Sequence, residues 1–172
     1  MTDLHTFSIV ARDPLTGEFG VAVSTARPNV GSLVPFASRR GAIATQARVN
    51  TDLGRQGLAL LDQDVPIHVA LRALLETDAD REIRQVHGVD GEYQFCHTGV
   101  GCVPWCGHQE GPDFTVAGNM LVGPQVIQAM ADAFRASQKE KRELSERLLL
   151  ALEAGQAVSR SPRGKRRAAH VP

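Results

Sequence analysis

Long apolar runs are missing from this sequence. No segment reaches the ~20 consecutive apolar residues that a membrane-spanning helix requires, and the opening residues 1–5 lack the basic patch and apolar core of a secretory signal. We therefore expect a soluble cytoplasmic protein without a membrane partner. Cysteine is also scarce, since only Cys96, Cys102 and Cys106 occur, all within 11 residues. An odd, clustered count is not a disulfide framework and suits a reducing compartment.

Motifs for nucleotide and zinc chemistry are absent as well. There is no G-x-G-x-x-G, no P-loop and no H-E-x-x-H, so nucleotide-binding and zinc-protease functions lose their main support. His97 and His108 flank the cysteine cluster, but the cluster has no paired C-x2-C knuckle. Strand alternation also directs Cys96 and His97 to opposite faces. The sequence predicts no metal site and no organic cofactor.

The net charge of zero conceals an asymmetry along the chain. Five basic residues and no acidic one lie in the last 13 positions, which leaves 14 basic against 19 acidic residues and a net charge of −5 for residues 1–158. A mildly acidic body argues against a nucleic-acid surface across the domain, so nucleic acid is not an expected partner. The basic tail is interpreted as solvated, with RNA, DNA or anionic lipid as the alternative partners.

Length and composition are those of one globular domain. The chain has 172 residues, of which 42% are hydrophobic and 22% charged, a balance that excludes disorder of the whole chain. We expect a single domain over residues 1–158 and a basic tail over residues 159–172.

Turn and strand signals dominate the first half of the chain. Residues 6–24 predict a β-hairpin around the turn Asp13-Pro14-Leu-Thr-Gly17, and residues 41–46 predict a buried strand. Asp90-Gly91 is a strong hairpin signal between predicted strands over residues 83–89 and 92–97. A further strand is predicted over residues 114–121, after a Gly-rich loop over residues 99–112.

Helix signals occur in two groups. The first group is predicted from the capping side chains of Asn50, Thr51 and Asp52, and from Asp64 followed by Pro66. The second group begins at Pro124 and at about Arg142, and the last helix is predicted to stop at Gly155. Because strands and helices are grouped rather than alternating, the order favours an α+β fold of antiparallel sheets covered by helices over a parallel Rossmann-type sheet.

Several short segments resemble those of DUF1028, a family of bacterial and archaeal proteins of unknown function assigned to the Ntn-hydrolase superfamily. The segments are Thr6-Phe-Ser-Ile-Val-Ala-Arg-Asp13, Gly20-Val-Ala-Val23, Ala44-Thr-Gln-Ala-Arg-Val-Asn50, Arg81-Glu-Ile-Arg84-Gln85-Val86, His97-Thr-Gly99, Cys102-Val-Pro-Trp105-Cys-Gly-His108 and Gly118-Asn-Met-Leu121. This resemblance implies a four-layer αββα sandwich of two antiparallel sheets. It also implies amide hydrolysis by an N-terminal nucleophile whose own α-amine is the base, which is chemically sensible because an α-amine has a pKa near 7.7–8.0.

Thr6 opens the first predicted strand, where such a nucleophile would lie. Because Thr6 follows His5, its nitrogen is an amide, and catalysis requires cleavage of the His5–Thr6 bond. The alternatives are an unprocessed chain, a lost mechanism, a nucleophile elsewhere, or a Thr6 that is simply a β-branched strand residue. Cys102 is also a possible nucleophile, but the favoured interpretation is that it is a small, buried, apolar residue.

Other residues are candidates for binding and for stabilising an oxyanion. Asn119 can offer an amide donor to an oxyanion, or it can be a turn residue. Gln46 and Thr45 end a strand just before a helix start, where they can meet an anion or carbonyl or cap the helix at residues 50–54. The predicted catalytic residues are Thr6, Asn119 and Gln46, and the predicted substrate-binding residues are Arg27, Thr45, Asn50, His97 and His108.

The C-terminal segment departs from the family pattern. Residues 159–172 are rich in Arg, Ser and Pro and have no strand pattern where the family continues with another apolar strand. We hypothesise a chain that is shortened relative to its relatives, with an open sheet edge that favours a homo-oligomer, dimeric or larger. The leading functional hypothesis is an Ntn-type amide hydrolase of a small amide or peptide-like substrate. The alternative is a non-catalytic protein of the same fold that binds a small molecule or serves assembly.

Overall fold

Two antiparallel sheets form the centre of the molecule. The computed structural model describes residues 5–140 and 142–160, and within these residues each sheet has four strands. Sheet A has the order β2-β1-β8-β7 and sheet B the order β3-β4-β5-β6, with every neighbouring pair antiparallel. The strands of sheet A are β1 (Thr6–Arg12), β2 (Phe19–Thr25), β7 (Gly107–Gly111) and β8 (Phe114–Asn119). Those of sheet B are β3 (Pro35–Ala37), β4 (Gly41–Ala47), β5 (Arg84–Asp90) and β6 (Gln94–Thr98).

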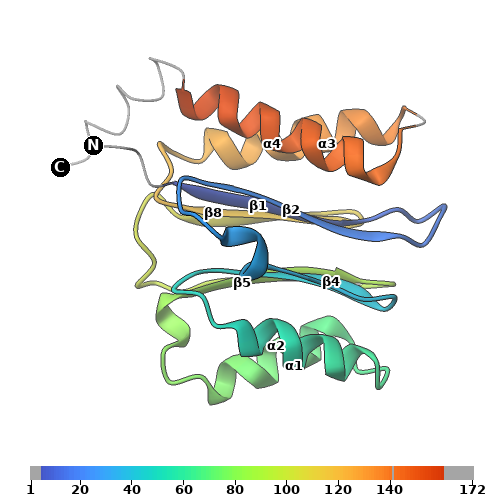
Figure 1. The fold of residues 1–172 in the computed structure, drawn as a ribbon, viewed down its shortest axis with the longest axis vertical. Coiled ribbons are helices and arrows are strands. Elements are labelled where there is room, and N and C mark those ends of the chain that lie inside the picture. The colour runs from blue at the N-terminus through green and yellow to red at the C-terminus, as the bar shows by residue number, and fades with distance from the viewer. Residues whose placement is uncertain (1–4, 141, 161–172) are drawn as a thin grey trace.

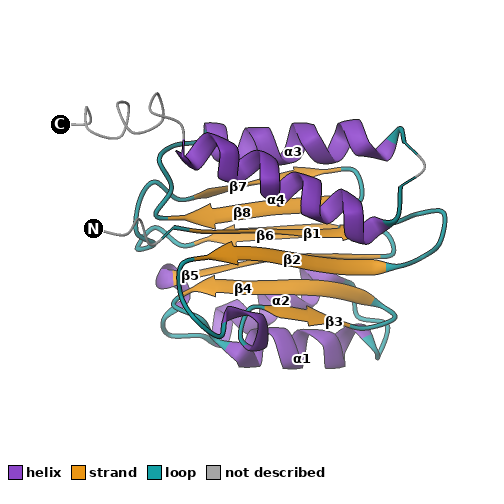
Figure 2. Cartoon of the chain, turned by 45° about the horizontal axis from the view of Figure 1, so that its top comes forward, coloured by secondary structure: helices purple, strands orange, loops and turns teal. Residues whose placement is uncertain are grey.

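The helices cover the outer faces of the two sheets. Figure 1 shows α3 (Gln125–Gln138) and α4 (Leu144–Arg160) above sheet A, and α1 (Thr51–Leu61) and α2 (Ile67–Thr77) below sheet B. Two short 3-10 turns, η1 (Val30–Ser32) and η2 (Arg81–Ile83), lie in connecting loops. The molecule is therefore a stack of helix, sheet, sheet and helix layers, in an α+β fold as expected (Figure 2).

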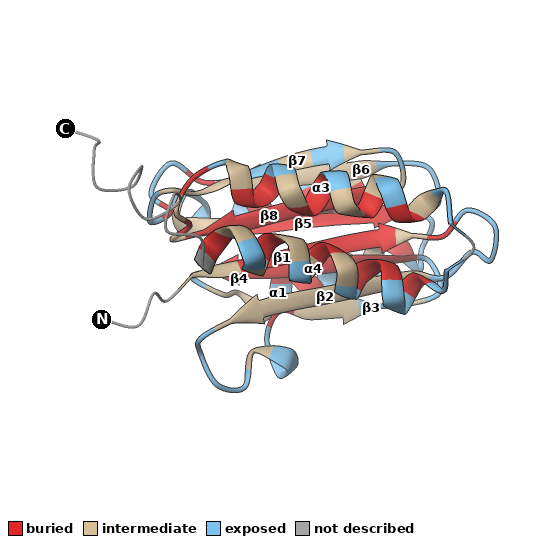
Figure 3. Cartoon of the chain, turned by 90° about the horizontal axis from the view of Figure 1, so that it is seen from above, coloured by how far each residue is buried: buried red, intermediate tan, exposed pale blue. Residues whose placement is uncertain are grey.

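Both faces of the central strands are buried, which explains why they lack a simple alternation of apolar and polar residues. In β1, Phe7 and Ile9 face the cluster formed with α3 and α4, whereas Val10 faces the space between the sheets. Figure 3 shows β8 buried along its length, β1 buried except at its two end residues, and β2 at the edge only partly buried.

The two kinds of interior differ in composition. Large apolar side chains such as Phe114, Phe134 and Met130 fill the layer between sheet A and its helices, and Ile67 and Leu71 fill the corresponding layer under sheet B. The apolar side chains between the sheets are smaller, chiefly Val and Ala. Buried polar side chains, including Ser8, Gln46 and His87, share this inner layer.

The two helices under sheet B begin in different ways. Asn50 caps α1 as expected, because its side-chain oxygen accepts a hydrogen bond from Asp52 N at 3.0 Å. The expected cap of α2 by Asp64 is wrong: Asp64 lies in a left-handed turn (φ 60°), and the cap comes from Asp90, whose Oδ2 accepts from Ile67 N at 2.7 Å. A carboxylate distant in sequence therefore replaces the local one.

Two strands at sheet edges were not predicted from the sequence. The segment 99–112, expected as a loop, contains β7, and β3 was not expected at all. β7 has the sequence Gly-His-Gln-Glu-Gly, with no apolar residue, because it is held by backbone pairing to β8 at the edge of the sheet. β3 has three residues and pairs with β4.

The last helix continues past its predicted end. Gly155 does not stop α4, which runs to Arg160. A Cβ at Gly155 would approach Met130 Cγ to 2.8 Å and Phe7 Cε2 to 3.2 Å, so glycine here permits close packing of the helix on sheet A. The rest of the predicted basic tail, residues 161–172, lies outside the described residues. Among the helices described, none is long and apolar enough to cross a membrane.

Candidate functional site

A cavity of about 690 Å³ opens where the strands β1, β2, β4 and β8 come to one end of the sandwich. Its polar lining is Thr6, Thr25, Arg27, Gln46, Arg48, Cys102 and Asn119. We call it the Thr6 cavity. It brings together four residues singled out from the sequence, namely Thr6, Arg27, Gln46 and Asn119.

Thr6 is the first residue of β1 and is partly exposed at this cavity. Antiparallel pairing places it opposite Thr25 on β2 and opposite Asn119 on β8. Its Oγ1 lies 2.9 Å from Thr25 Oγ1, so the two hydroxyls share a hydrogen bond. The close approach of β8 depends on Gly118, where a Cβ would lie 3.0 Å from the carbonyl oxygen of Thr6.

Gln85 holds the two buried amides of the cavity in place. Its Oε1 accepts hydrogen bonds from Gln46 Nε2 at 2.8 Å and from Asn119 Nδ2 at 3.0 Å. Its Nε2 donates to the carbonyl oxygens of Gly118 at 2.9 Å and Gly107 at 3.1 Å. Because backbone carbonyls only accept, the orientation of the Gln85 amide is fixed, and that of Gln46 follows from it.

The orientation of the Gln46 amide determines which group donates in each hydrogen bond further inside the protein. Gln46 turns its Oε1 toward Ser8, so the Ser8 hydroxyl donates to it at 2.8 Å. Ser8 has one proton, and therefore His87 Nε2, 2.7 Å from Ser8 Oγ, must be the donor to Ser8. His87 Nδ1 then accepts from the Thr115 hydroxyl at 2.9 Å. These hydrogen bonds form a polar column between the sheets, running from Thr115 through His87, Ser8 and Gln46 to Gln85.

His87 is neutral in this column. Burial, together with the charge of His108, lowers the pKa of His87 to about 3. The Ser8–His87 contact resembles a nucleophile with its base, but here His87 donates to Ser8 and Ser8 is fully buried. The column therefore supports the amides of the cavity and offers no activated serine.

Backbone strain is concentrated at the same cavity. Among the described residues, five that are not glycine have positive φ: Asn29, Ala47, Asp64, Asp113 and Met120. Asn and Asp adopt this conformation readily, whereas Ala and Met rarely do. Ala47 (φ 66°) directly follows Gln46, and Met120 (φ 58°) directly follows Asn119. Such strain persists where surrounding contacts enforce it, commonly at functional sites.

Cys102 lines the cavity but has no features of a nucleophile. It is buried, and its Sγ donates to the carbonyl oxygen of Arg84 at 3.3 Å. Burial and the neighbouring Cys106 raise the pKa of the Cys102 thiol, so the thiolate is disfavoured.

The remaining predicted binding residues lie outside the Thr6 cavity. Thr45 is fully buried and its hydroxyl donates to the carbonyl oxygen of Asn50 at 3.2 Å. Asn50 caps α1 and donates to Asp78 Oδ2 at 2.9 Å. His97 Nε2 lies 2.9 Å from the carbonyl oxygen of Arg81, and His108 Nδ1 lies 2.8 Å from Thr98 Oγ1. Their roles in binding stay predictions.

Four residues of the site were not expected from the sequence, namely Ser8, Gln85, His87 and Thr115. For Ser8 and Thr115 a signal was available, because each is a polar residue among the mainly apolar residues of its strand, whereas β5, with Gln85 and His87, has several polar residues. Arg48, which adds a second cation to the cavity, stood within a motif but was not singled out.

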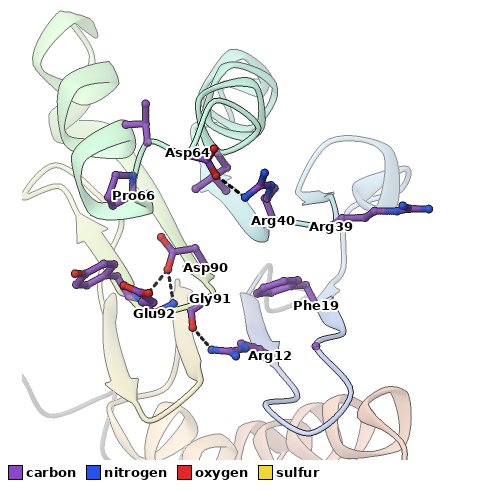
Figure 4. A pocket seen from close by; sticks show the side chains of 13 residues that line it. Arg12, Phe19, Arg39, Arg40, Asp64, Pro66, Asp90, Gly91 and Glu92 are labelled. Atoms are coloured by element: carbon purple, nitrogen blue, oxygen red, sulfur yellow. Dashed lines mark hydrogen bonds and ion pairs between the residues drawn. The ribbon is translucent and has the colours of Figure 1, made fainter.

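A second pocket, of about 410 Å³, lies at the opposite end of the strands (Figure 4). Four of its charged side chains are occupied with another side chain or with the backbone. Arg40 pairs with Asp64, Arg12 donates to the carbonyl oxygen of Gly91, and Asp90 accepts from three backbone N–H groups. Arg39 points away from it. This pocket therefore offers less for recognition than the Thr6 cavity.

Comparisons with known proteins agree with the motifs noted in the sequence. The model of DUF1028, described as a family of unknown function, matches residues 6–171. The fold is similar to that of protein SPO2555 from Silicibacter pomeroyi, a crystal structure assigned to the same family, with a TM-score of 0.84 and 30% sequence identity. That similarity covers 90% of this chain and 69% of the other. No curated protein matches the chain.

Proposed function

The chain belongs to the DUF1028 family, and we propose that it is an amide hydrolase of the N-terminal-nucleophile type, with Thr6 as the nucleophile after cleavage of the His5–Thr6 bond. The observation on which the proposal depends is that the Thr6 hydroxyl and the amides of Gln46 and Asn119 line one cavity at the end of β1. The helix–sheet–sheet–helix stack is compatible with the αββα sandwich of Ntn hydrolases.

The chemistry needs a free α-amine on Thr6. That amine takes the proton from Oγ1 as Oγ1 attacks the carbonyl carbon of the substrate, and it returns the proton to the departing amine as the C–N bond breaks. Water then attacks the acyl ester on Thr6, releasing a carboxylic acid and restoring the hydroxyl. An α-amine is suited to this because its pKa of about 7.7–8.0 is close to neutral pH.

Gln46 and Asn119 are the proposed oxyanion donors. Each carries two amide protons, of which one is donated to Gln85 Oε1. Within the described part of the chain, the second proton of each amide has no acceptor, and both residues line the cavity. Fixed donors are effective oxyanion stabilisers because they need no reorganisation during the reaction.

The test compares two forms of the protein with a β-lactone, a reagent that acylates threonine nucleophiles. A chain beginning at Thr6 should gain the mass of the reagent on its first residue, and Thr6→Ala should not. The full chain with an intact Met1 terminus should also remain unlabelled. Absence of labelling on a folded chain that begins at Thr6 would overturn the proposal.

The second candidate is a non-catalytic protein that binds a small molecule in the same cavity. It is favoured by His5, which precedes Thr6 in peptide linkage and stacks on Phe7 with ring centroids 5.6 Å apart. N-terminal sequencing of the native protein separates the two candidates: Thr6 as the first residue supports the enzyme, and an upstream terminus on folded protein supports the binding protein.

A further inference from the structure

We propose that the Thr6 cavity takes an amide that carries both a carboxylate and an apolar group, with the carboxylate bound by Arg27 and Arg48. This inference rests on the proposed function in taking the Thr6 cavity as the substrate site, but the ligand class is argued from the lining alone.

The two arginines are free to bind an anion. Arg27 follows the end of β2, Arg48 follows the end of β4, and both are exposed where they line the cavity. Within the described residues, neither side chain has a carboxylate or another hydrogen-bond acceptor as partner, whereas Arg12, Arg40, Arg84 and most other arginines do. Free guanidinium groups with two parallel donors are well matched to a carboxylate.

The cavity itself supplies no competing negative charge. None of its lining residues is acidic. Glu82 is close enough to raise the pKa of the Cys102 thiol, but its carboxylate pairs with Arg81 at 3.6 Å and accepts from Val100 N at 3.3 Å. The electrostatic potential of the cavity is therefore positive, which favours an anionic ligand.

Apolar side chains form the rest of the wall. Val30, Leu33, Val49, Ile83 and Val103 line the cavity beside the arginines. Leu33 is 40% exposed and Val103 is 55% exposed, so a ligand seated against them would remove apolar surface from water. A carboxylate with an aliphatic or aromatic group is thus a better match than a purely polar anion.

The lining residues lie at different depths in the cavity, and these depths indicate how a ligand would be oriented. Gln46 and Asn119 are 1% and 4% exposed, whereas Arg27 and Arg48 lie on the exposed segments beyond the strand ends. The carboxylate would therefore be held at the mouth and the amide carbonyl directed inward to Thr6.

The test measures binding of N-acylglycines, from acetyl to dodecanoyl, and of their methyl esters to the full chain by isothermal titration calorimetry. At least one free acid should bind about tenfold or more tightly than its ester, because only the acid makes charge-assisted hydrogen bonds. Arg27→Ala and Arg48→Ala should each weaken the acid by about tenfold and leave the ester unchanged, with partial recovery in Arg27→Lys and Arg48→Lys. Arg72→Ala, at another exposed arginine on α2, is the matched control and should change nothing.

Any one of three results would overturn the inference: equal affinity for acids and esters, no effect of the two arginine substitutions, or no binding across the whole acid series. The outcome is separate from that of the proposed function. Acid-selective binding that persists in Thr6→Ala while no chain beginning at Thr6 is acylated supports this inference and rejects the enzyme. Turnover of neutral amides without preference for acids supports the proposed enzyme and rejects this inference.

Discussion

Gln85 accepts a hydrogen bond from Asn119, with 3.0 Å between Gln85 Oε1 and Asn119 Nδ2, so a residue of sheet B positions an amide of sheet A. The same oxygen accepts from Gln46. One side chain therefore sets the geometry of both proposed oxyanion donors, although it does not itself line the cavity.

Replacing Gln85 with glutamate should make stability depend on pH. In Gln85→Glu the ionised carboxylate would face the carbonyl oxygens of Gly107 and Gly118, at a cost of about 3 kcal/mol at pH 7. Burial and these carbonyls favour the neutral acid, so its pKa in the folded state is raised. The contribution of the neutral acid is then fully present below the unfolded pKa of about 4.3 and lost as the pH rises through the folded value.

Urea unfolding at a series of pH values checks this prediction. Gln56→Glu, at an exposed position on α1, serves as the control and should follow the wild-type curve. A Gln85→Glu protein as stable as the wild type at pH 7 would contradict the orientation assigned to the Gln85 amide.

The buried His87 should make the wild-type protein acid-sensitive in a definite pH range. Its pKa is about 3 in the folded protein, against an ordinary value of 6.5. The unfolded chain therefore binds a proton that the folded chain refuses between these values, and stability falls as the pH falls from about 6.5, by up to about 1.4 kcal/mol per pH unit. The Asp78 carboxyl, whose pKa Arg84 lowers to about 2, acts only at lower pH.

Unfolding free energies at pH 6.5, 5.5 and 4.5 measure that dependence. His87→Gln should lose most of this pH dependence. Burial also lowers the pKa of His108, but His108 is less completely buried, so His108→Gln should retain most of the dependence. The same slope in His87→Gln as in the wild type would show that another group is responsible.

Ala47→Gly should relieve the strain beside Gln46 without loss of stability. A left-handed conformation costs a non-glycine residue about 1–2 kcal/mol, and the added freedom of glycine in the unfolded chain offsets about 0.4–1 kcal/mol of the gain. We expect the free energy of unfolding to stay the same or rise by up to about 1.6 kcal/mol. In the exposed strand residue Ala37, the same substitution should instead cost about 0.5–1 kcal/mol. Thermal unfolding of both variants decides the matter, and a clear loss in Ala47→Gly would contradict the argument.

The ion pair between Arg147 and Asp13 should be strongly coupled. Arg147 Nη1 lies 3.0 Å from Asp13 Oδ2, both side chains are at least 90% buried, and the guanidinium lies over the ring of Phe134 at 4.8 Å. Arg147→Met leaves a buried carboxylate without its partner and should cost about 3–5 kcal/mol. The double variant Asp13→Asn with Arg147→Met should recover part of this loss, which a double-mutant cycle in urea measures. Strict additivity of the two substitutions would indicate that the pair is not coupled.

The sequence was sufficient for the parts of the fold that depend on local chemistry. The hairpin around Asp13-Pro14 and the cap at Asn50 were predicted because turns and caps are specified by neighbouring residues. The strand β7 was not, because backbone pairing to β8 defines it rather than its own side chains. Gly155 was misjudged for a related reason, since the contact with Met130 that requires it comes from another helix.

The candidate site shows the same division. Thr6 was proposed because of the family resemblance, and Gln46 and Asn119 because they stand near the ends of predicted strands; the structure brings all three to one cavity. Gln85 and His87 were missed because their importance comes from partners 13 to 79 positions away in the chain. A single sequence does not state which buried polar residues will face each other across two sheets.

The polar column also has a consequence for how the domain folds. Sheet B and its two helices come from one continuous stretch, residues 35–98, whereas sheet A is assembled from chain segments on either side of that stretch. Hydrogen bonds of the column cross between the sheets at Ser8–Gln46, Ser8–His87 and Thr115–His87. Each half alone would lose these hydrogen bonds to water and would expose the apolar inner face that the other half covers, including Val10 on sheet A and Ala42 and Val89 on sheet B. We therefore expect the inserted stretch and the flanking segments to fold and unfold as one cooperative unit, although residues 35–98 are continuous in the chain.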